Sequence, residues 1–392
     1  MIRFIVGQKQ INLSRLIVFA LSAIGLESCA NKPSKLVADP QPGNNRPSAL
    51  VSKPQPRKSG RTFADWCRQK ADLSPEAKHT VDVLLQKAET TECDTANQKL
   101  FSLTKLDLDN NKISDIKPLQ SLTQLTKLVL LNNRISDIKP LKSLTNLTEL
   151  SLSNNQINDI KPLQFLTNLK NLDLNNHQIS DIKPLQFLTN LTVLQLSGNK
   201  ISDIKPLASL TNLTVIFLGN NQITDVKPLE SLNKLTFLYL EKNKVSDIKP
   251  LESLTNLTEL NLSNNQISDI KPLESLTKLI VVFLDNNKIS DIKTLQSLTN
   301  LAMLRLSDNQ ISNIKPLESL TKLTFLLIEN NQITDIKPLQ SLTDLMRIDI
   351  KNNQISDIKP LQSLTKLNWL SLSGNPIAPK TCPLKPESIC NW

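Results

Sequence analysis

The chain has 392 residues, a formal net charge of +10, only seven glycines and only two histidines. With so few glycines and histidines, the sequence contains no Gly-rich phosphate loop and no cluster of acid–base residues. We therefore predict a non-catalytic protein without a cofactor or bound metal, and we interpret His79 and His177 as structural residues. Residues 1–62 carry ten basic and two acidic side chains, and residues 63–392 carry 36 basic and 34 acidic ones. The nearly neutral remainder excludes a nucleic-acid-binding face.

The first 28 residues have the composition of a signal peptide. Three basic residues accompany an apolar run at residues 16–26, which is too short to span a bilayer. The run leads into L-E-S-C at Leu26–Cys29, which resembles a bacterial lipoprotein signal whose cysteine becomes the lipidated first residue. The resemblance implies an exported protein of the cell envelope or cell surface, anchored by a lipid at Cys29. Ordinary cleavage near Ala30 without a lipid is the alternative.

Residues 29–62 are predicted to form a flexible basic tether. Residues 30–60 contain six prolines and almost no large apolar side chains, so they cannot bury enough surface to offset the entropy lost on ordering. The same stretch has six basic side chains against Asp39 alone. A basic tether beside a lipid favours contact with an anionic membrane surface.

Residues 63–99 are predicted to form a small helical cap at the amino-terminal end of the fold. Ser74 and Pro75 suit a helix start, with serine as the N-cap and proline in the first turn, and four apolar residues follow at helical spacing. Cys67 and Cys93 flank this helix, and export permits a disulfide between them. A zinc site is the alternative, but the pair lacks the C-x₂₋₄-C spacing with nearby histidine.

A 22-residue repeat occupies residues 100–376. The frame L-x-L-x-x-N begins at Leu106 and returns without insertion or deletion to Leu370, which makes 13 units. Apolar residues spaced by two predict a short strand, and those spaced by three predict a 3₁₀-like or extended return segment. One unit cannot bury its apolar face alone, so stacked units share one core. The Asn closing each frame is expected to bond neighbouring turns as a ladder, which His177 interrupts.

The repeat L-T-x-L-x-x-L-x-L-x-x-N-x-I-S-D-I-K-P-L-x-S resembles the 22-residue leucine-rich repeats of bacterial internalins. The resemblance implies an α/β solenoid shaped as a horseshoe, with a parallel concave β-sheet and a convex side of 3₁₀ or extended segments. It also implies a protein partner on the concave face, because the best-known internalins bind host proteins there. Residues 377–392 are predicted to cap the other end, with a disulfide between Cys382 and Cys390. We expect a monomer that reaches a membrane only through its lipid.

Three positions in each unit point out of the predicted concave sheet: the residues before, between and after the two strand leucines. Six of the 14 aromatic residues lie there, including the only tyrosine. Adjacent strands lie about 4.8 Å apart, so we expect solvent-facing Phe217 and Tyr239 to touch, and Val215 to touch Phe237. Such an apolar stripe with a charged rim is typical of a binding site, and β-propensity alone is the alternative explanation. The predicted ligand-binding residues are Val193, Val215, Phe217, Phe237, Tyr239, Val281, Phe283, Met303, Arg305, Phe325, Leu327, Arg347 and Trp369.

The sequence therefore predicts a non-catalytic, protein-binding solenoid displayed at the cell envelope. A structural or glycan-binding envelope protein without a specific protein partner is the alternative, because aromatic platforms also stack on sugars. A second aromatic pair, Phe165 and Phe187, replaces the usual serine on the convex side of two adjacent units. We interpret this second pair as packing.

Overall fold

The computed structural model describes residues 4–6, 9–11 and 61–392, and the chain divides into two units, Met1–Arg57 and Lys58–Trp392. In the first unit, β1 (Phe4–Val6) pairs antiparallel with β2 (Lys9–Ile11). Apart from these two short strands, the predicted signal peptide, Cys29 and the predicted tether as far as residue 60 lie outside the described residues, whereas Arg61 and Thr62 are described.

The second unit begins with a helical cap. Thr62 caps the first helix reciprocally with Asp65, and Ser74 caps the next one, whose first residue is Pro75, as its sequence predicts. A disulfide between Cys67 and Cys93 ties the first helix to the start of the last one. The helices are α2 (Phe63–Arg68), α3 (Pro75–Lys87) and α4 (Cys93–Ser102), with a 3₁₀ turn, η1 (Lys70–Asp72), between the first two.

The cap joins the first repeat through helix α3 and through the core. The Thr80 hydroxyl donates to the Asp115 carbonyl at 2.7 Å, and His79 Nε2 lies 2.6 Å from the Asn111 carbonyl oxygen. Leu84 and the neighbouring cap residues are fully buried in the same hydrophobic cluster as the repeats. The cap therefore continues the core past the first strand and shields its open end.

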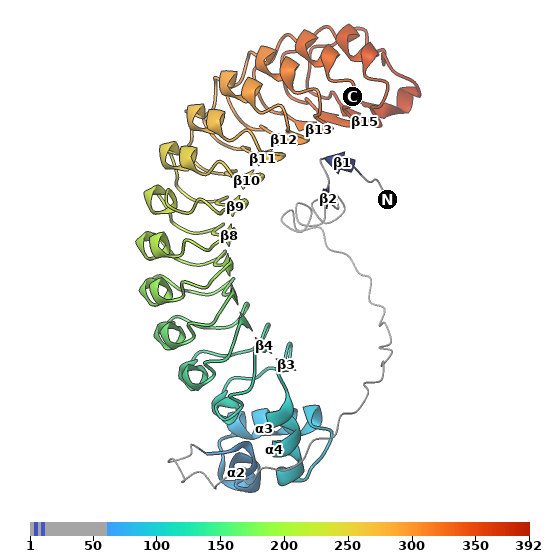
Figure 1. Ribbon diagram of the computed structural model, residues 1–392. Coiled ribbons are helices and arrows are strands. Elements are labelled where there is room, and N and C mark those ends of the chain that lie inside the picture. Colours follow the sequence, from blue (N-terminus) through green and yellow to red (C-terminus); the bar gives the residue numbers. More distant parts are fainter. Residues whose placement is uncertain (1–3, 7–8, 12–60) are drawn as a thin grey trace. The chain divides into compact units, whose positions relative to one another are not determined.

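The repeats and the carboxyl-terminal segment build one parallel sheet of 14 strands in the described residues, in sequence order along the inner side of the arc formed by residues 61–392 (Figure 1). Within the repeats, each strand residue pairs with the residue 22 positions away, such as Leu238 with Leu260. The strands are β3 (Lys105–Asp107), β4 (Lys127–Val129), β5 (Glu149–Ser151), β6 (Asn171–Asp173), β7 (Val193–Gln195), β8 (Val215–Phe217), β9 (Phe237–Tyr239), β10 (Glu259–Asn261), β11 (Val281–Phe283), β12 (Met303–Arg305), β13 (Phe325–Leu327), β14 (Arg347–Asp349), β15 (Trp369–Ser371) and β16 (Cys390–Asn391).

The last strand, β16, lies beyond the 13 predicted units. It pairs with β15, so that Leu370 faces Cys390, and Cys390 forms a disulfide with Cys382. The short carboxyl-terminal segment thus covers the edge of the sheet, which would otherwise present unpaired backbone groups.

A 3₁₀ turn lies on the convex side of every unit that returns to a further strand. In most units the turn begins one residue before a proline, which Thr294 replaces in η10. The aspartate two residues before the start of the turn accepts a backbone bond, as when Asp137 Oδ1 accepts from the Lys139 N–H at 2.9 Å, and Asn313 takes this role before η11. The predicted return segment is thereby confirmed. The turns are η2 (Lys117–Leu119), η3 (Lys139–Ser143), η4 (Lys161–Phe165), η5 (Lys183–Phe187), η6 (Lys205–Ser209), η7 (Lys227–Leu229), η8 (Lys249–Ser253), η9 (Lys271–Ser275), η10 (Lys293–Ser297), η11 (Lys315–Ser319), η12 (Lys337–Ser341), η13 (Lys359–Ser363) and, in the carboxyl-terminal segment, η14 (Glu387–Ile389).

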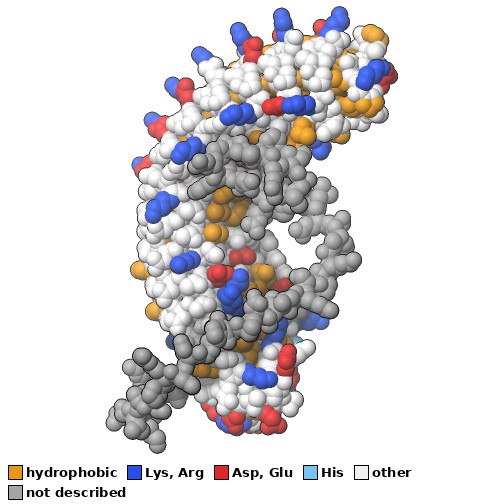
Figure 2. All heavy atoms as spheres, turned by 45° about the vertical axis from the view of Figure 1, so that its right-hand side comes forward, with side chains coloured by type: hydrophobic (Ala, Val, Ile, Leu, Met, Phe, Trp, Pro, Cys, Tyr) orange, Lys and Arg blue, Asp and Glu red, His pale blue; other side chains and the backbone are white. Residues whose placement is uncertain are grey.

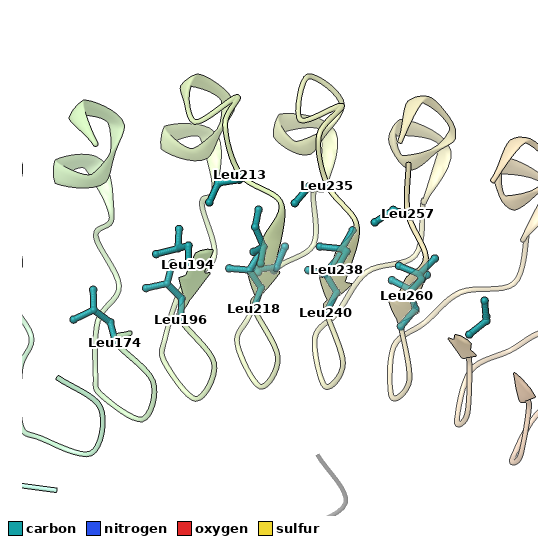
Figure 3. Packing of buried hydrophobic residues seen from close by; sticks show 14 of the residues in the cluster. Leu174, Leu194, Leu196, Leu213, Leu218, Leu235, Leu238, Leu240, Leu257 and Leu260 are labelled. Carbon is teal, nitrogen blue, oxygen red and sulfur yellow. The ribbon is translucent and has the colours of Figure 1, made fainter. Parts of the chain in front are cut away.

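The leucines form one continuous core between the sheet and the turns. Leu194, Leu238 and Leu260, at the same position in three units, are each at most 1% exposed, and their side chains point between the strand and the turn (Figure 3). Because each unit contacts its neighbours through these side chains, the stability of the fold depends on nearest-neighbour stacking.

The predicted asparagine ladder is confirmed. Asn221 Nδ2 donates to the carbonyls of Leu196 and Leu218, both at 3.0 Å, and its Oδ1 accepts from the Ile201 N–H at 3.0 Å. One buried side chain therefore satisfies backbone groups of two successive units. Equivalent bonds recur along the repeats. This explains why nearly every unit has asparagine at this position.

A second column of asparagines, one residue before the ladder position, was not predicted from the sequence. The residue before the ladder position has positive φ in all 13 units, such as Asn132 at 52° and Gly198 at 71°. Asn and Gly adopt this left-handed conformation most readily, so they dominate the position. The side chains also bond along the exposed edge, since Asn154 Nδ2 donates to Asn132 Oδ1 at 2.7 Å.

His177 occupies the ladder position in one unit. Its Nδ1 accepts a long bond from the Ile157 N–H at 3.4 Å, while its buried Nε2 has no partner. Burial lowers the pKa of the imidazole below its ordinary value. The ring therefore replaces only part of the bonding that Asn provides, and it stays neutral so that Nδ1 can accept.

Replacing His177 with Asn is expected to raise the free energy of unfolding by about 1 kcal/mol at neutral pH, because the ladder bonds are restored. The pKa of His177 is lower in the folded than in the unfolded chain, so the unfolded state binds more protons as pH falls below about 6.5. The native chain thus loses stability there, and the variant lacks this contribution. Urea unfolding at about pH 7.5 and pH 5 measures both effects, and parallel pH profiles of the two proteins would contradict the prediction.

Candidate ligand-binding surface

The 13 predicted ligand-binding residues, which we term the concave stripe, flank the central core residue of strands β7 to β9 and β11 to β15. Successive side chains of a strand point to opposite faces, so these residues face away from the core, toward the inner side of the arc. Hydrophobic side chains along that inner side are visible in Figure 2. The strands therefore place the whole predicted set on one face of the sheet.

The centre of the concave stripe is a pair of stacked rings. The ring centroids of Phe217 and Tyr239 lie 4.6 Å apart with an interplanar angle of 16°. Val215 faces Phe237 in the same strand pair. The predicted contact of Phe217 with Tyr239 is confirmed, because the parallel register places residues 22 apart side by side.

Two arginines toward the carboxyl-terminal half cover aromatic rings. The guanidinium carbon of Arg305 lies 5.2 Å from the Phe283 ring centroid, and that of Arg347 lies 4.0 Å from the Trp369 ring. Arg305 also forms an ion pair with Asp285, at 2.7 Å. Both cations are attracted to the ring faces. Asp285 offsets the charge of Arg305, so Arg347 is the exposed cation of this pair.

The sequence predicts that the concave stripe faces solvent, but three of its residues are buried and only Arg347 is exposed. Tyr239 and Phe283 are each 4% exposed and Val281 is 9% exposed, while Phe217 is half-buried and Arg347 is exposed. Rings and long side chains on adjacent strands lie against one another at the strand spacing, so they cover one another's faces. The half-buried residues are Val193, Val215, Phe217, Phe237, Met303, Arg305, Phe325, Leu327 and Trp369.

Buried acids accompany the concave stripe. Burial raises the pKa of the carboxyl groups of Glu241, Glu259 and Asp285, and it raises that of Asp349 to about 6 with help from a bond to Glu329. Nothing in the sequence indicates that Glu259 and Asp349, which lie at outward positions of the sheet, are buried. Glu241 follows strand β9 at the third of the three outward positions, after Phe237 and Tyr239, but it was not among the residues predicted to bind the ligand.

The interpretation of Phe165 and Phe187 as packing is wrong. They are 52% and 50% exposed, at the ends of the adjacent turns η4 and η5. In other units the serine at this position bonds the preceding turn, as when the Ser143 hydroxyl donates to the Gln120 carbonyl at 2.7 Å. Phenylalanine cannot make this bond, and the tight turn leaves no space beneath it, so the ring points outward.

Hollows of about 730 to 770 Å³ lie between convex turns, lined by the repeated Asp, Lys, Pro and Ser positions. The same residue types line each of them, so they are a property of the repeat. Within the described ranges, no group of three or more His, Cys, Asp or Glu side chains could hold a metal ion, and no helix has the length and hydropathy to cross a membrane.

Comparisons with known proteins agree with this geometry. A family model described as "Leucine Rich repeats (2 copies)" and another described as "Leucine rich repeat" match most of the chain between residues 102 and 377. A search of curated proteins finds no match. The matched residues are 102–143, 145–187, 189–231, 211–254, 233–275, 255–297 and 299–341 for the first family model and 321–377 for the second.

Several solved structures resemble this chain over most of its length. An internalin (inlF) of Listeria monocytogenes is 34% identical, with 76% of this chain and 98% of that chain covered and a TM-score of 0.67. A leucine-rich-repeat protein of Leptospira interrogans is 28% identical, with 84% and 96% covered and a TM-score of 0.68. A plant peptide hormone receptor, RGFR1 in complex with RGF2, shares the fold at 20% identity, with 71% and 57% covered and a TM-score of 0.56.

The chain therefore belongs to the leucine-rich-repeat family, whose members are typically non-enzymatic scaffolds with an extended concave binding surface. Within that family its 22-residue repeats are of the internalin type, and the predicted solenoid fold is confirmed.

Proposed function

We propose that the concave stripe binds a protein partner. The observation that carries the proposal is the stack of Phe217 on Tyr239 at the centre of apolar side chains that run over several strands, with Arg305 and Arg347 fixed toward one end. Aromatic and arginine side chains supply most of the binding energy in protein interfaces, and a rigid sheet holds them in place before binding. The plant receptor complex offers a precedent for a peptide ligand on this fold.

A glycan ligand is the alternative, because sugars also stack on aromatic rings. The two ligands differ in the contacts they need. The concave stripe places apolar side chains on strands β7 to β9 and β11 to β15, an extent that suits a protein surface. A sugar instead needs one platform with dense polar groups around it.

Phe217→Ser and Phe325→Ser are each expected to weaken partner binding by about 2 kcal/mol, or roughly thirtyfold. Both rings are half-buried on the concave side, so a stable fold tolerates their loss better than that of buried Tyr239. The immobilised full-length chain would capture the partner for mass spectrometry, and surface plasmon resonance would then measure each affinity.

Phe187→Ser is the matched control, since it removes an equally large ring from the convex side. Normal affinity of the two concave variants together with lost affinity of the convex variant would refute the proposal. A glycan array run with the same proteins identifies a sugar ligand if no protein is captured.

We also propose that the solenoid is displayed at the cell envelope, on the basis of the predicted signal peptide and Cys29. Mass spectrometry of the mature amino-terminal peptide tests this proposal. A chain lipidated at Cys29 is heavier than a cleaved, unlipidated chain by the mass of the acyl groups.

A further inference from the structure

Glu259 is the most buried acid of the concave side. It begins strand β10, between Phe237 and Val281 of the flanking strands, and it is 2% exposed. One carboxylate oxygen, Oε2, accepts a hydrogen bond from the Tyr239 hydroxyl, while Oε1 has no partner. A carboxylate with an unsatisfied buried oxygen is costly, so the site lacks a donor.

A second carboxylate lies on the other side of the same tyrosine. Glu241 follows Tyr239 by two residues, and its Oε2 is buried without a partner. Its Oε1 occupies space that a side chain at Gly219 would fill, since a Cβ there would lie 2.1 Å from it. Tyr239 and Glu241 are two residues apart and so face the same side of the sheet, and the Tyr239 hydroxyl bonds Glu259. Burial first, and then repulsion from Glu259 and Glu241, raise the pKa of Tyr239.

The other acids buried on this face, Asp285 and Asp349, have a cation nearby, and so has Glu149. Glu149 occupies the same repeat position as Glu259 and pairs with Lys127 at 2.7 Å, and Asp285 pairs with Arg305 at 2.7 Å. Over residues 61–392, neither Glu259 nor Glu241 forms an ion pair, although attraction to Lys242 partly opposes the raised pKa of Glu241. The two acids beside Tyr239 therefore differ from their counterparts in lacking a positive partner.

We propose that Phe217, Tyr239, Glu241 and Glu259 form a binding site for the guanidinium or ammonium group of an arginine or lysine side chain of the partner. Such a group could donate hydrogen bonds to the two carboxylate oxygens that lack a partner, and it gains attraction from the stacked rings. Two carboxylates beside two aromatic rings offer too few oxygen ligands for a calcium or magnesium ion, so the site suits an organic cation. This inference rests on the proposed function, since it specifies the partner group that the centre of the concave stripe recognises.

The test compares two amides that differ in charge but not in shape. N-acetyl-L-arginine amide and its neutral analogue N-acetyl-L-citrulline amide are titrated into the full-length chain, followed by NMR chemical shifts. The arginine compound is expected to bind at least about tenfold more tightly, because only it carries a full charge to the two carboxylates. Glu259→Gln and Glu241→Gln are each expected to remove most of this preference.

Glu149→Gln is the matched control, because Lys127 already neutralises that carboxylate, and it should leave the preference unchanged. Equal binding of the two amides to the native chain would overturn the proposal, as would an unchanged preference in both Glu259→Gln and Glu241→Gln. The amide comparison on the native chain decides the matter even if one variant fails to fold.

The same measurements separate this inference from the proposed function. If Phe325→Ser weakens the partner while the native chain shows no preference for the arginine amide, the cation site is refuted and the concave stripe stands. If the native chain prefers the arginine amide in a Glu259-dependent way while no concave variant weakens the partner, the proposed function fails and the cation site stands.

Discussion

Replacing Leu260 with alanine is expected to lower the free energy of unfolding by about 2–5 kcal/mol. Leu260 is 1% exposed at the centre of strand β10, and it faces Leu238 and Val282 on the two neighbouring strands. Alanine leaves a cavity that the close-packed column cannot fill, because each neighbour is held in register by its own strand. Urea denaturation of the full-length chain, followed by circular dichroism, measures the loss.

Leu327→Ala is the control, since Leu327 lies on strand β13 but faces the concave side and is half-buried. This substitution should cost about 1 kcal/mol or less, because much of the side chain already contacts solvent. Equal losses in the two variants would mean that the core and concave positions of the strand have been assigned to the wrong faces.

The core and concave positions could be assigned from the sequence because the repeat never slips. A fixed interval of 22 residues forces Leu238 and Leu260 into one column, and the same interval stacks Phe217 on Tyr239. Side-chain alternation then decides which residues face the core. The strand order, the register and the buried asparagine ladder of the repeats all follow from the fixed interval of 22 residues.

Features that depend on side-chain reach were not predictable in this way. The bond from Tyr239 to Glu259 crosses to the adjacent strand on a diagonal, so no repeat position marks it. Glu241 bends into the space above Gly219, which a linear pattern does not reveal. The burial of Tyr239 and Phe283 likewise depends on how far neighbouring rings extend, whereas the repeat specifies only where each side chain begins.

The exposed Phe165 and Phe187 illustrate the opposite error. An apolar residue that replaces a serine suggests packing, but the 3₁₀ turn holds that position at the surface whatever residue occupies it. The backbone conformation, which is the same in all units, therefore overrides the hydrophobicity of a single side chain.

Removing the disulfide of the amino-terminal cap, with Cys67→Ser and Cys93→Ser together, is expected to cost about 3–4 kcal/mol of stability. The bond closes a loop of 26 residues, and opening it increases the entropy of the unfolded chain. We expect the first repeats to be destabilised together with the cap, because helix α3 bonds the first repeat through Thr80 and shields the end of the core. Denaturation of both proteins under oxidising conditions measures the difference.

Cys382→Ser with Cys390→Ser provides the comparison at the other end of the solenoid. That disulfide closes only 8 residues, so the loop-entropy contribution falls to about 2–3 kcal/mol. Exchange of amide hydrogens should report each loss locally, with faster exchange in β3 and β4 for the first variant and in β14 and β15 for the second. Since every unit is stabilised by its neighbours, protection should recover toward the middle strands in both proteins. Uniform loss of protection along all the strands would show instead that the solenoid unfolds as a single cooperative unit.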